Sequence, residues 1–363
     1  MSSTSPRTYR AVPHAAAVIT ALLALLPIAL GAQTTTKAAG MAFPDWPTSD
    51  GHGMLSYPWF AATGAKFLEH GHRLAGVLIG VSSIVLAATL WIRDRRSWVC
   101  LMGNGVVFAV IVQGILGGQR VLLDARGLAF IHGSTAALVF SYMWGVAVVT
   151  SRGWFTSHSS EGSSSPSTAL SWLSIATYVA VYVQYVLGGL VRHQGQALVE
   201  HLVFAFVAAL AILILAVSAA STGQKWLLFP SLASGVLMLV QLVLGAGTWV
   251  TKYGFGDAGN PVYGSTEQIA FRTSHVLNGM LLFASVSVLV FRIQRLRWLA
   301  TATGRNMSGR VSERAFPLSA GIATPGGTRC RVWQPRQRLR SPHRPRSLWV
   351  KCLWVRRRSP KFP

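Results

Sequence analysis

The sequence predicts an all-α integral membrane protein, with eight transmembrane helices in two pseudo-symmetric four-helix bundles. Three observations predict this fold. Hydrophobic residues make up 51% of the 363 residues and charged residues only 12%, about half of the roughly 25% found in soluble domains. Eight apolar stretches have the length that crosses a bilayer. A short motif recurs at the end of alternate stretches, and such a repeat indicates a repeated structural unit.

Each of the eight apolar stretches is predicted to be one transmembrane helix. They cover residues 14–32, 70–92, 98–118, 128–150, 170–190, 198–220, 227–250 and 270–292. The first also has features of a secretory signal peptide, because Arg7 and Arg10 precede it and small residues end it. We favour a span, since the stretch contains a copy of the repeat, which a cleaved signal has no reason to carry.

The spans divide the chain into five regions. We expect a cytoplasmic N-terminus (1–13), an N-terminal four-helix half (14–150), a Ser-rich cytoplasmic linker (151–169), a C-terminal four-helix half (170–297) and a disordered basic tail (298–363). Lys and Arg are more frequent in the loops on the side of both termini. This bias places both termini in the cytoplasm of a bacterial cell, with the protein multi-pass in the cell membrane.

The basic excess is concentrated in the tail. Residues 301–363 contain 15 Lys or Arg and one acidic residue, which accounts for +14 of the formal charge of +23. On a membrane protein such an excess favours contact with anionic lipids, so we expect the lipid bilayer as a partner and no nucleic acid. A shifted reading frame at the end of the gene would produce the same composition.

The repeated motif is Val-Gln-x-x-Leu-Gly. It occurs at 112–118, 183–189 and 240–246, and a degenerate copy with Leu-Pro in place of Val-Gln occurs at 26–32. Each copy ends an odd-numbered span, and a histidine opens the next span after an outer loop. We therefore expect four histidines at similar depth, in the outer half of the membrane and facing a common interior. They are His72, His132, His201 and His275.

Four histidines at equivalent positions favour metal ligands over ordinary polar contacts. A ligating side chain inside a span is rare and usually functional, although a single histidine is as well explained by a hydrogen bond between helices. Imidazole suits zinc, copper, iron and haem iron. No cluster of acidic residues or cysteines accompanies all four, which argues against zinc and di-iron sites. Histidine pairs on facing helices, among small and apolar residues, suit a flat macrocycle with two axial ligands.

The second span carries a further candidate for chemistry. Glu69 precedes His72 by three residues and so shares its helix face, whereas His70 and Arg73 are expected to point elsewhere. A carboxylate one turn from an iron ligand can move protons or stabilise positive charge on a reacting carbon. The alternative is that Glu69 only favours the start of the helix.

The motif's other residues and the first outer loop are expected to be structural. Gln113, Gln184 and Gln241 would bond across helices, or else reach a haem propionate. The glycines would let helices approach closely or leave room for a ring. The long aromatic and Pro-rich loop over residues 40–59 would cover the site at His72 and His132, or form an aromatic belt at the membrane surface.

These motifs together resemble the haem A synthase family of bacterial and mitochondrial membranes, over about residues 15–295. Any one of them would be weak, but the combination is specific. The matching elements are Leu30-Gly31-Ala32 with Thr36-Lys37, the loop from Gly40 to Pro47, Glu69-x-x-His72-Arg73, Gln113-x-x-Leu116-Gly117 with His132, Gly188 to His193, His201 and His275.

The resemblance implies an oxidoreductase that acts on a CH group. Haem b would be the cofactor, with His201 and His275 as axial ligands, and the substrate haem O would lie between His72 and His132. The carboxylate of Glu69 would act when the methyl group of haem O is oxidised to the formyl group of haem A, by successive hydroxylations, for cytochrome c oxidase biogenesis. The partners would be haem O synthase and an unidentified electron acceptor; a homo-oligomer is left open.

The sequence differs from the family pattern at two places, and two other functions are therefore considered. The first outer loop lacks the cysteine pair that many bacterial members carry, and Leu202 follows His201 where arginine is frequent. A di-haem electron-transfer cytochrome without a product would share the four histidines, but it would leave Glu69 without a role. A repeat-containing transporter would be expected to have helices broken at mid-depth, whereas these apolar stretches are mostly unbroken.

Overall fold

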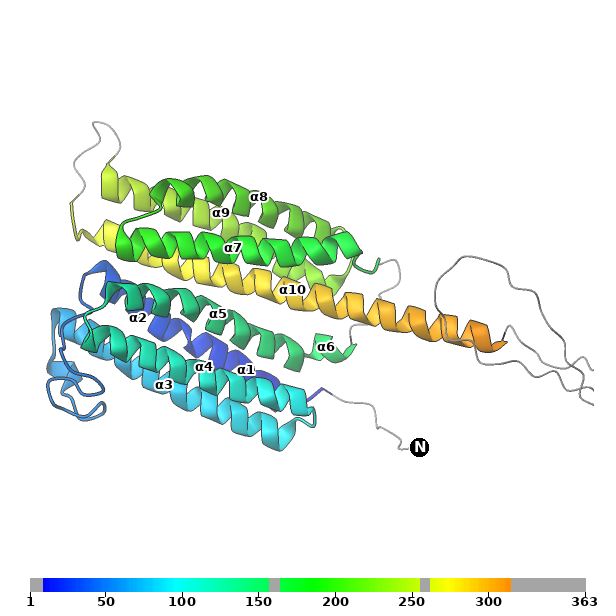
Figure 1. The fold of residues 1–363 in the computed structure, drawn as a ribbon, viewed down its shortest axis with the longest axis horizontal. Coiled ribbons are helices and arrows are strands. Elements are labelled where there is room, and N and C mark those ends of the chain that lie inside the picture. Colours follow the sequence, from blue (N-terminus) through cyan, green and yellow to red (C-terminus); the bar gives the residue numbers. More distant parts are fainter. Residues whose placement is uncertain (1–8, 157–163, 255–261, 315–363) are drawn as a thin grey trace, which may run out of the picture. The chain divides into compact units, whose positions relative to one another are not determined.

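The computed structural model describes residues 9–156, 164–254 and 262–314, with the backbone alone for 303–314. All regular elements in these ranges are helices (Figure 1). They are α1 (Ala11–Leu23), α2 (Leu25–Thr36), the short 3₁₀ helix η1 (Trp59–Ala61), α3 (Gly64–Arg93), α4 (Ser97–Leu122), α5 (Arg126–Thr150), α6 (Arg152–Thr156), α7 (Thr168–Gln194), α8 (Leu198–Ala220), α9 (Lys225–Tyr253) and α10 (Thr266–Arg314).

Eight helices within the described ranges are long and apolar enough to cross a membrane, counting α1 and α2 as one. Each contains one of the apolar stretches, so the expected all-α, eight-span membrane fold is confirmed. The first span packs against α3 and α5. It is interrupted between Leu23 and Leu25, because Pro27 has no N–H group to donate to the carbonyl four residues earlier.

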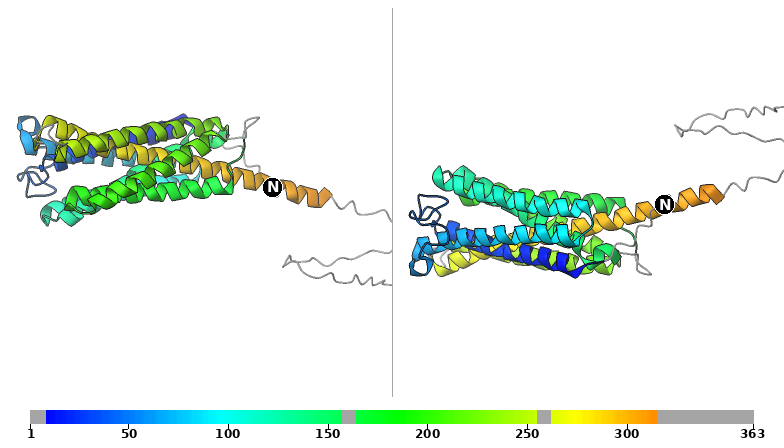
Figure 2. Two further views of the ribbon diagram at one scale, coloured as in Figure 1. Left: turned by 90° about the horizontal axis from the view of Figure 1, so that it is seen from above. Right: turned by 90° about the horizontal axis from the view of Figure 1, so that it is seen from below.

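Successive spans run in opposite directions, which gives residues 9–303 two ends (Figures 1 and 2). At one end, here called the loop face, α3, α5, α8 and α10 begin and the loop over residues 37–63 lies. At the opposite end, the start face, α1, α4, α7 and α9 begin. Short connections keep neighbouring helices antiparallel. Helix α7, for example, ends at the loop face because Gly195 adopts the left-handed conformation (φ 71°), and α8 begins at Leu198.

Helices α5 and α10 are the innermost spans. The most apolar window of α5 is 61% buried and that of α10 is 50% buried, whereas no other span exceeds 33%. Polar contacts join them inside the bundle: the Ser141 hydroxyl lies 2.8 Å from that of Ser287 and 3.1 Å from that of Tyr178 on α7. Further along α5, Gly145 faces the ring of Phe291. Helix α5 therefore connects the first set of helices to the second.

The chain divides into two compact units, residues 1–303 and residues 304–363. The first contains all eight spans, so the division into halves at 14–150 and 170–297 stays a prediction. Helix α10 continues to Arg314. Residues 315–363 of the expected tail and 157–163 of the expected linker lie outside the described residues.

We expect Gly145→Leu to destabilise the fold through the contact between α5 and α10. A Cβ at this position would lie 2.7 Å from Cζ of Phe291, and overpacking of this kind costs about 1–3 kcal/mol. The measurement is the thermal unfolding midpoint in detergent. Gly76→Leu on α3 is the matched control, since Gly76 is exposed and a Cβ there meets nothing within 4 Å. Equal midpoints for the two variants would contradict the expectation.

Candidate functional site

The four histidines lie in the structure as two pairs. The ring centroids of His72 on α3 and His132 on α5 are 6.3 Å apart, with an angle of 87° between the rings. Those of His201 on α8 and His275 on α10 are 6.4 Å apart, at 85°. Each histidine lies within the first three turns of its helix from the loop face. The expectation of similar depth therefore agrees with the structure, but the histidines face one another two by two.

The spacing within each pair suits two axial ligands of one haem iron. A metal–imidazole bond is about 2 Å long, and the centre of an imidazole ring lies roughly 1 Å beyond its coordinating nitrogen. Two coaxial ligands therefore have centroids about 6 Å apart, close to both observed values. Among the described residues no three His, Cys, Asp or Glu side chains gather into a metal site. A pair of histidines fits a macrocycle, because the macrocycle supplies the remaining ligands of the iron itself.

Each histidine ring packs against the glycine of the preceding copy of the repeat. A Cβ atom added to each of these glycines would lie close to Cε1 of the histidine ring. The distances are 2.9 Å for Gly31 and His72, 3.3 Å for Gly117 and His132, 3.0 Å for Gly188 and His201, and 3.3 Å for Gly245 and His275. A side chain at these positions would push the ring aside. The Leu-Gly part of the motif thus provides the space in which the next helix places its histidine.

In the degenerate copy of the repeat, at residues 26–32, a backbone carbonyl orients the histidine of the next span. Nδ1 of His72 lies 2.9 Å from the carbonyl oxygen of Pro27, which occupies the position of the motif's glutamine. A carbonyl oxygen can only accept, so Nδ1 carries the proton. Nε2 then keeps its lone pair for a metal, as in most histidine ligands.

In the other three copies, the glutamine side chain lies against the histidine. The expected bonding across helices is confirmed, and its partner is the ring of the next span. Nε2 of Gln184 lies 3.1 Å from Nδ1 of His201, Nε2 of Gln241 lies 3.3 Å from Nε2 of His275, and the Gln113 amide, with its nitrogen turned to the ring, lies 3.0 Å from Nδ1 of His132. An amide nitrogen can only donate, so the ring nitrogen that faces each glutamine accepts. In the described part of the chain, Nδ1 of His275 is buried without a partner.

Glu69 is buried, with 2% of its surface exposed, and both its carboxylate oxygens are engaged. Oε2 accepts a hydrogen bond of 2.7 Å from the N–H group of Ala42, and Oε1 accepts one of 2.8 Å from Arg73. The expectation that Arg73 points elsewhere is wrong, because residues four apart share a helix face. Glu69 therefore anchors the loop over residues 37–63. Its catalytic role stays a prediction.

The same loop is fastened to α3 by further polar contacts. Arg73 donates to the carbonyl oxygens of Asp45 (2.9 Å) and Thr48 (2.6 Å), and Nδ1 of His70 lies 2.9 Å from the hydroxyl of Ser49. His70 thus faces the loop. These contacts hold the loop against the start of α3, one turn from His72. That it covers the histidine pair stays a prediction.

The loop is also stabilised internally through Asp45. Its carboxylate accepts hydrogen bonds from the N–H groups of Asp50 (3.0 Å) and Gly51 (2.9 Å). Burial alone raises the pKa of this carboxyl, but hydrogen bonds from the Thr48 side chain and these two N–H groups outweigh it and lower the pKa to about 2. The turn therefore stays ionised and intact at any physiological pH.

Two arginines near the histidine pairs, Arg120 and Arg192, are not among the site residues that the sequence predicts. Arg120 donates to the carbonyl oxygen of Gly40 (2.7 Å) and lies within electrostatic range of His72 and His132. Arg192 on α7 donates to the carbonyl oxygen of Ala32 on α2 (2.5 Å). Arginine is well suited to bind carboxylates such as haem propionates. Both arginines follow the repeat's glycine by one helical turn, and this spacing is the signal that could have identified them.

The chain matches a protein-family model. The family model COX15-CtaA, described as cytochrome oxidase assembly protein, matches residues 14–202. That stretch includes Glu69, His72, His132 and His201, while His275 lies beyond it. No curated protein matches the chain.

We expect Gly31→Ala to weaken haem binding between His72 and His132. The new methyl group would lie 2.9 Å from Cε1 of His72. Overpacking of about 1–3 kcal/mol would weaken binding roughly 5- to 150-fold. Haem content and the low-spin absorption of the purified protein report this change. Gly114→Ala is the control, because a Cβ there meets nothing within 4 Å; unchanged haem content in both variants would show that the packed glycine is not required.

Proposed function

The chain belongs to the COX15-CtaA family of cytochrome oxidase assembly proteins, and from this membership we propose that it is a haem A synthase. It oxidises the methyl group of haem O to the formyl group of haem A, by successive hydroxylations, for cytochrome c oxidase biogenesis. The observation that carries the proposal is the presence of two histidine pairs, each with the spacing of two axial ligands of one iron. Two haem sites in one chain suit an enzyme whose substrate and cofactor are both haems.

We assign haem O to the pair His72 and His132, and haem b to the pair His201 and His275. The support for this assignment is the asymmetry between the two sites. Glu69 and the loop over residues 37–63 lie beside the first pair, whereas only a short turn joins α7 to α8 beside the second. When bound, haem b supplies a redox centre that takes electrons from the substrate and passes them to an acceptor. Arg120 and Arg192 are suited to bind propionates at the two sites.

Groups of the protein itself orient the substrate and stabilise the charge that develops on it. The Pro27 carbonyl fixes the His72 tautomer that leaves Nε2 free to bind the substrate iron. The loop over residues 37–63 excludes water, which strengthens electrostatic interactions at the site. Each oxygen of the Glu69 carboxylate accepts one hydrogen bond and retains a lone pair. The carboxylate can therefore stabilise positive charge at the substrate carbon and accept a proton.

A di-haem electron-transfer cytochrome is the second candidate function. The observation in its favour is the near-identical geometry of the two pairs, which electron transfer between equivalent haems would also use. It leaves unexplained why, among the described residues, a carboxylate is buried beside the first pair and none beside the second. The synthase accounts for both features.

We propose that the start face is cytoplasmic and that the protein lies in the cell membrane. Within residues 9–156, 164–254 and 262–302, the start face has nine Lys or Arg and one acid (Asp94), whereas the loop face has eight Lys or Arg and six acids. Loops rich in Lys and Arg remain on the cytoplasmic side. The haem sites, near the loop face, then lie in the outer half of the membrane.

Expression in a host that makes haem O but not haem A tests the function. We expect haem A, or its hydroxylated precursor, among the haems extracted from membranes that contain the protein. Chromatography with mass detection measures the products. Haem-loaded, folded protein that yields neither product would exclude the synthase and leave the electron-transfer cytochrome.

A pair of substitutions separates catalysis by Glu69 from its anchoring role. We expect Glu69→Gln to retain the haem spectrum but lower haem A formation at least tenfold, because the amide cannot accept a proton or balance positive charge. Arg73→Gln breaks the same ion pair from the other side and serves as the control. If both variants lose activity equally, with equal loss of stability, Glu69 only holds the loop.

A further inference from the structure

Three arginines on the start face lie over aromatic rings from several helices. Cζ of Arg96 is 4.6 Å from the ring centroid of Phe155, that of Arg292 is 5.1 Å from Trp226, and that of Arg295 is 4.7 Å from Trp154. Trp154 in turn lies 6.1 Å from Trp98. These residues, Arg96, Arg292, Arg295, Trp98, Trp154, Phe155 and Trp226, form what we call the arginine–aromatic cluster. It joins α10 to the ends of α4, α6 and α9.

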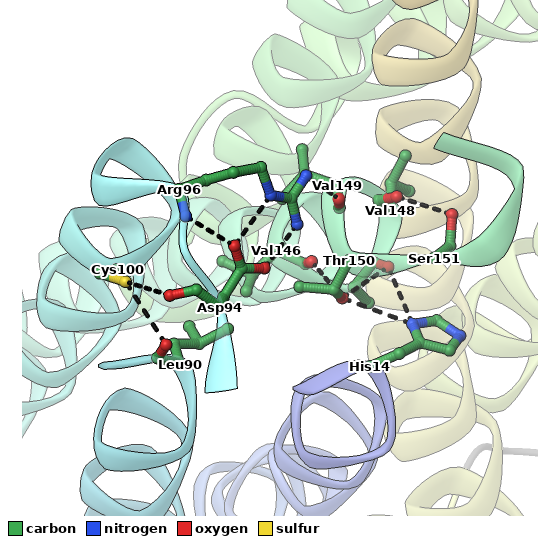
Figure 3. Close-up of polar contacts among 11 residues, drawn as sticks. His14, Leu90, Asp94, Arg96, Cys100, Val146, Val148, Val149, Thr150 and Ser151 are labelled. Atoms are coloured by element: carbon green, nitrogen blue, oxygen red, sulfur yellow. Dashed lines mark hydrogen bonds and ion pairs between the residues drawn. The ribbon is translucent and has the colours of Figure 1, made fainter. Parts of the chain in front are cut away.

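One arginine of the cluster has a carboxylate partner. Asp94 accepts from Nε (2.9 Å) and Nη2 (2.6 Å) of Arg96, which also donates to the carbonyl oxygen of Val149 (2.9 Å; Figure 3). Burial raises the pKa of the Asp94 carboxyl, but the hydrogen bonds from Arg96 outweigh this and lower it. Asp94 is therefore ionised and already forms an ion pair with Arg96.

Among the described residues, the other two arginines have N–H groups without an acceptor. Arg292 donates to the carbonyl oxygen of Trp226 (2.5 Å), and Arg295 donates weakly to that of Trp154 (3.4 Å). Within the described residues, Nε of both is buried without a partner, and neither forms an ion pair. A guanidinium group has five N–H donors. Both side chains are half-buried, and a charge withdrawn from water is normally paired. The arrangement therefore calls for an anion with several oxygen atoms.

The residues whose side chains the structure describes do not supply this anion on the start face. Within residues 9–156, 164–254 and 262–302, Asp94 is the one acid there, against nine Lys or Arg. On the loop face, by contrast, six acids accompany eight Lys or Arg. The excess positive charge is thus specific to the end at which Arg292 and Arg295 lie.

The place of the cluster identifies the anion. It lies at the ends of transmembrane helices; its member Trp98 is 41% exposed, and Trp298, which lies beside Arg295, is 56% exposed. Exposed tryptophans at helix ends mark the depth of lipid headgroups, and basic pockets between spans bind anionic headgroups. We propose that Arg292 and Arg295 bind the phosphate of an anionic phospholipid. The planar guanidinium matches two phosphate oxygens at once, and the long side chains can turn at the helix end to present their free donors. The lipid then joins α10 to α6 and α9.

Lipid binding to the full-length protein in detergent tests the proposal. The probes are phosphatidylglycerol, phosphatidylcholine and inorganic phosphate, and the readouts are lipid retained in native mass spectra and the thermal unfolding midpoint. We expect phosphatidylglycerol to be retained and to raise the midpoint, with little effect of the other two. Equal retention of phosphatidylcholine would overturn the proposal. A rise with inorganic phosphate alone would show a phosphate site that is not a lipid site.

Matched variants locate the binding site. The double variant Arg292→Gln with Arg295→Gln should bind phosphatidylglycerol at least tenfold more weakly, which is on the order of what two interfacial cations contribute. Arg93→Gln with Arg95→Gln removes the same charge from exposed positions on the same face and should change binding less than about twofold. Equal losses would indicate unspecific attraction and overturn the site. Arg295→Lys keeps the charge without the planar fork; if the double variant does not fold, full binding by Arg295→Lys would likewise overturn it.

Discussion

The contact between a glycine on one helix and a histidine ring on the next is the constraint on which both candidate haem sites depend. A histidine near a helix end could adopt many orientations. The glycine removes the obstacle on one side of the ring, and Pro27 or a motif glutamine holds a ring nitrogen. Because the same arrangement occurs four times, two pairs of nearly equal spacing result. Ligand positions held by packing in this way need little rearrangement when an iron binds.

Function is proposed where the repeat is least regular. In the first copy, proline replaces glutamine, the helix is interrupted, and a long loop follows. That loop is fastened by the buried ion pair between Glu69 and Arg73. Removing one partner of such a pair typically costs about 3–5 kcal/mol, because the other charge is left buried. The loop, the carboxylate and the histidine pair are therefore coupled, which is why a variant of Glu69 must be compared with one of Arg73.

The two ends of the bundle differ in how their charges are balanced. On the loop face, arginines pair with Glu69 or with backbone carbonyls near the histidines, as Arg120 does. On the start face, arginines lie over aromatic rings with few acceptors. The first arrangement suits carboxylates of a bound haem, and the second suits lipid phosphate. Both follow from the need of a buried or interfacial charge for a counter-charge.

The eight spans and the candidate ligands can be predicted from the sequence, because apolar length and a repeat along the chain are local properties. After each copy of the motif, as at residues 26–32 and 112–118, the next span carries a histidine. The contacts of each side chain come from the packing of the folded chain. That Glu69 bonds Ala42 and Arg73, or that Arg120 reaches Gly40, depends on how a loop folds back over helices distant in sequence. Helical periodicity specifies the face on which a residue lies, whereas the partner on that face is set by packing between helices.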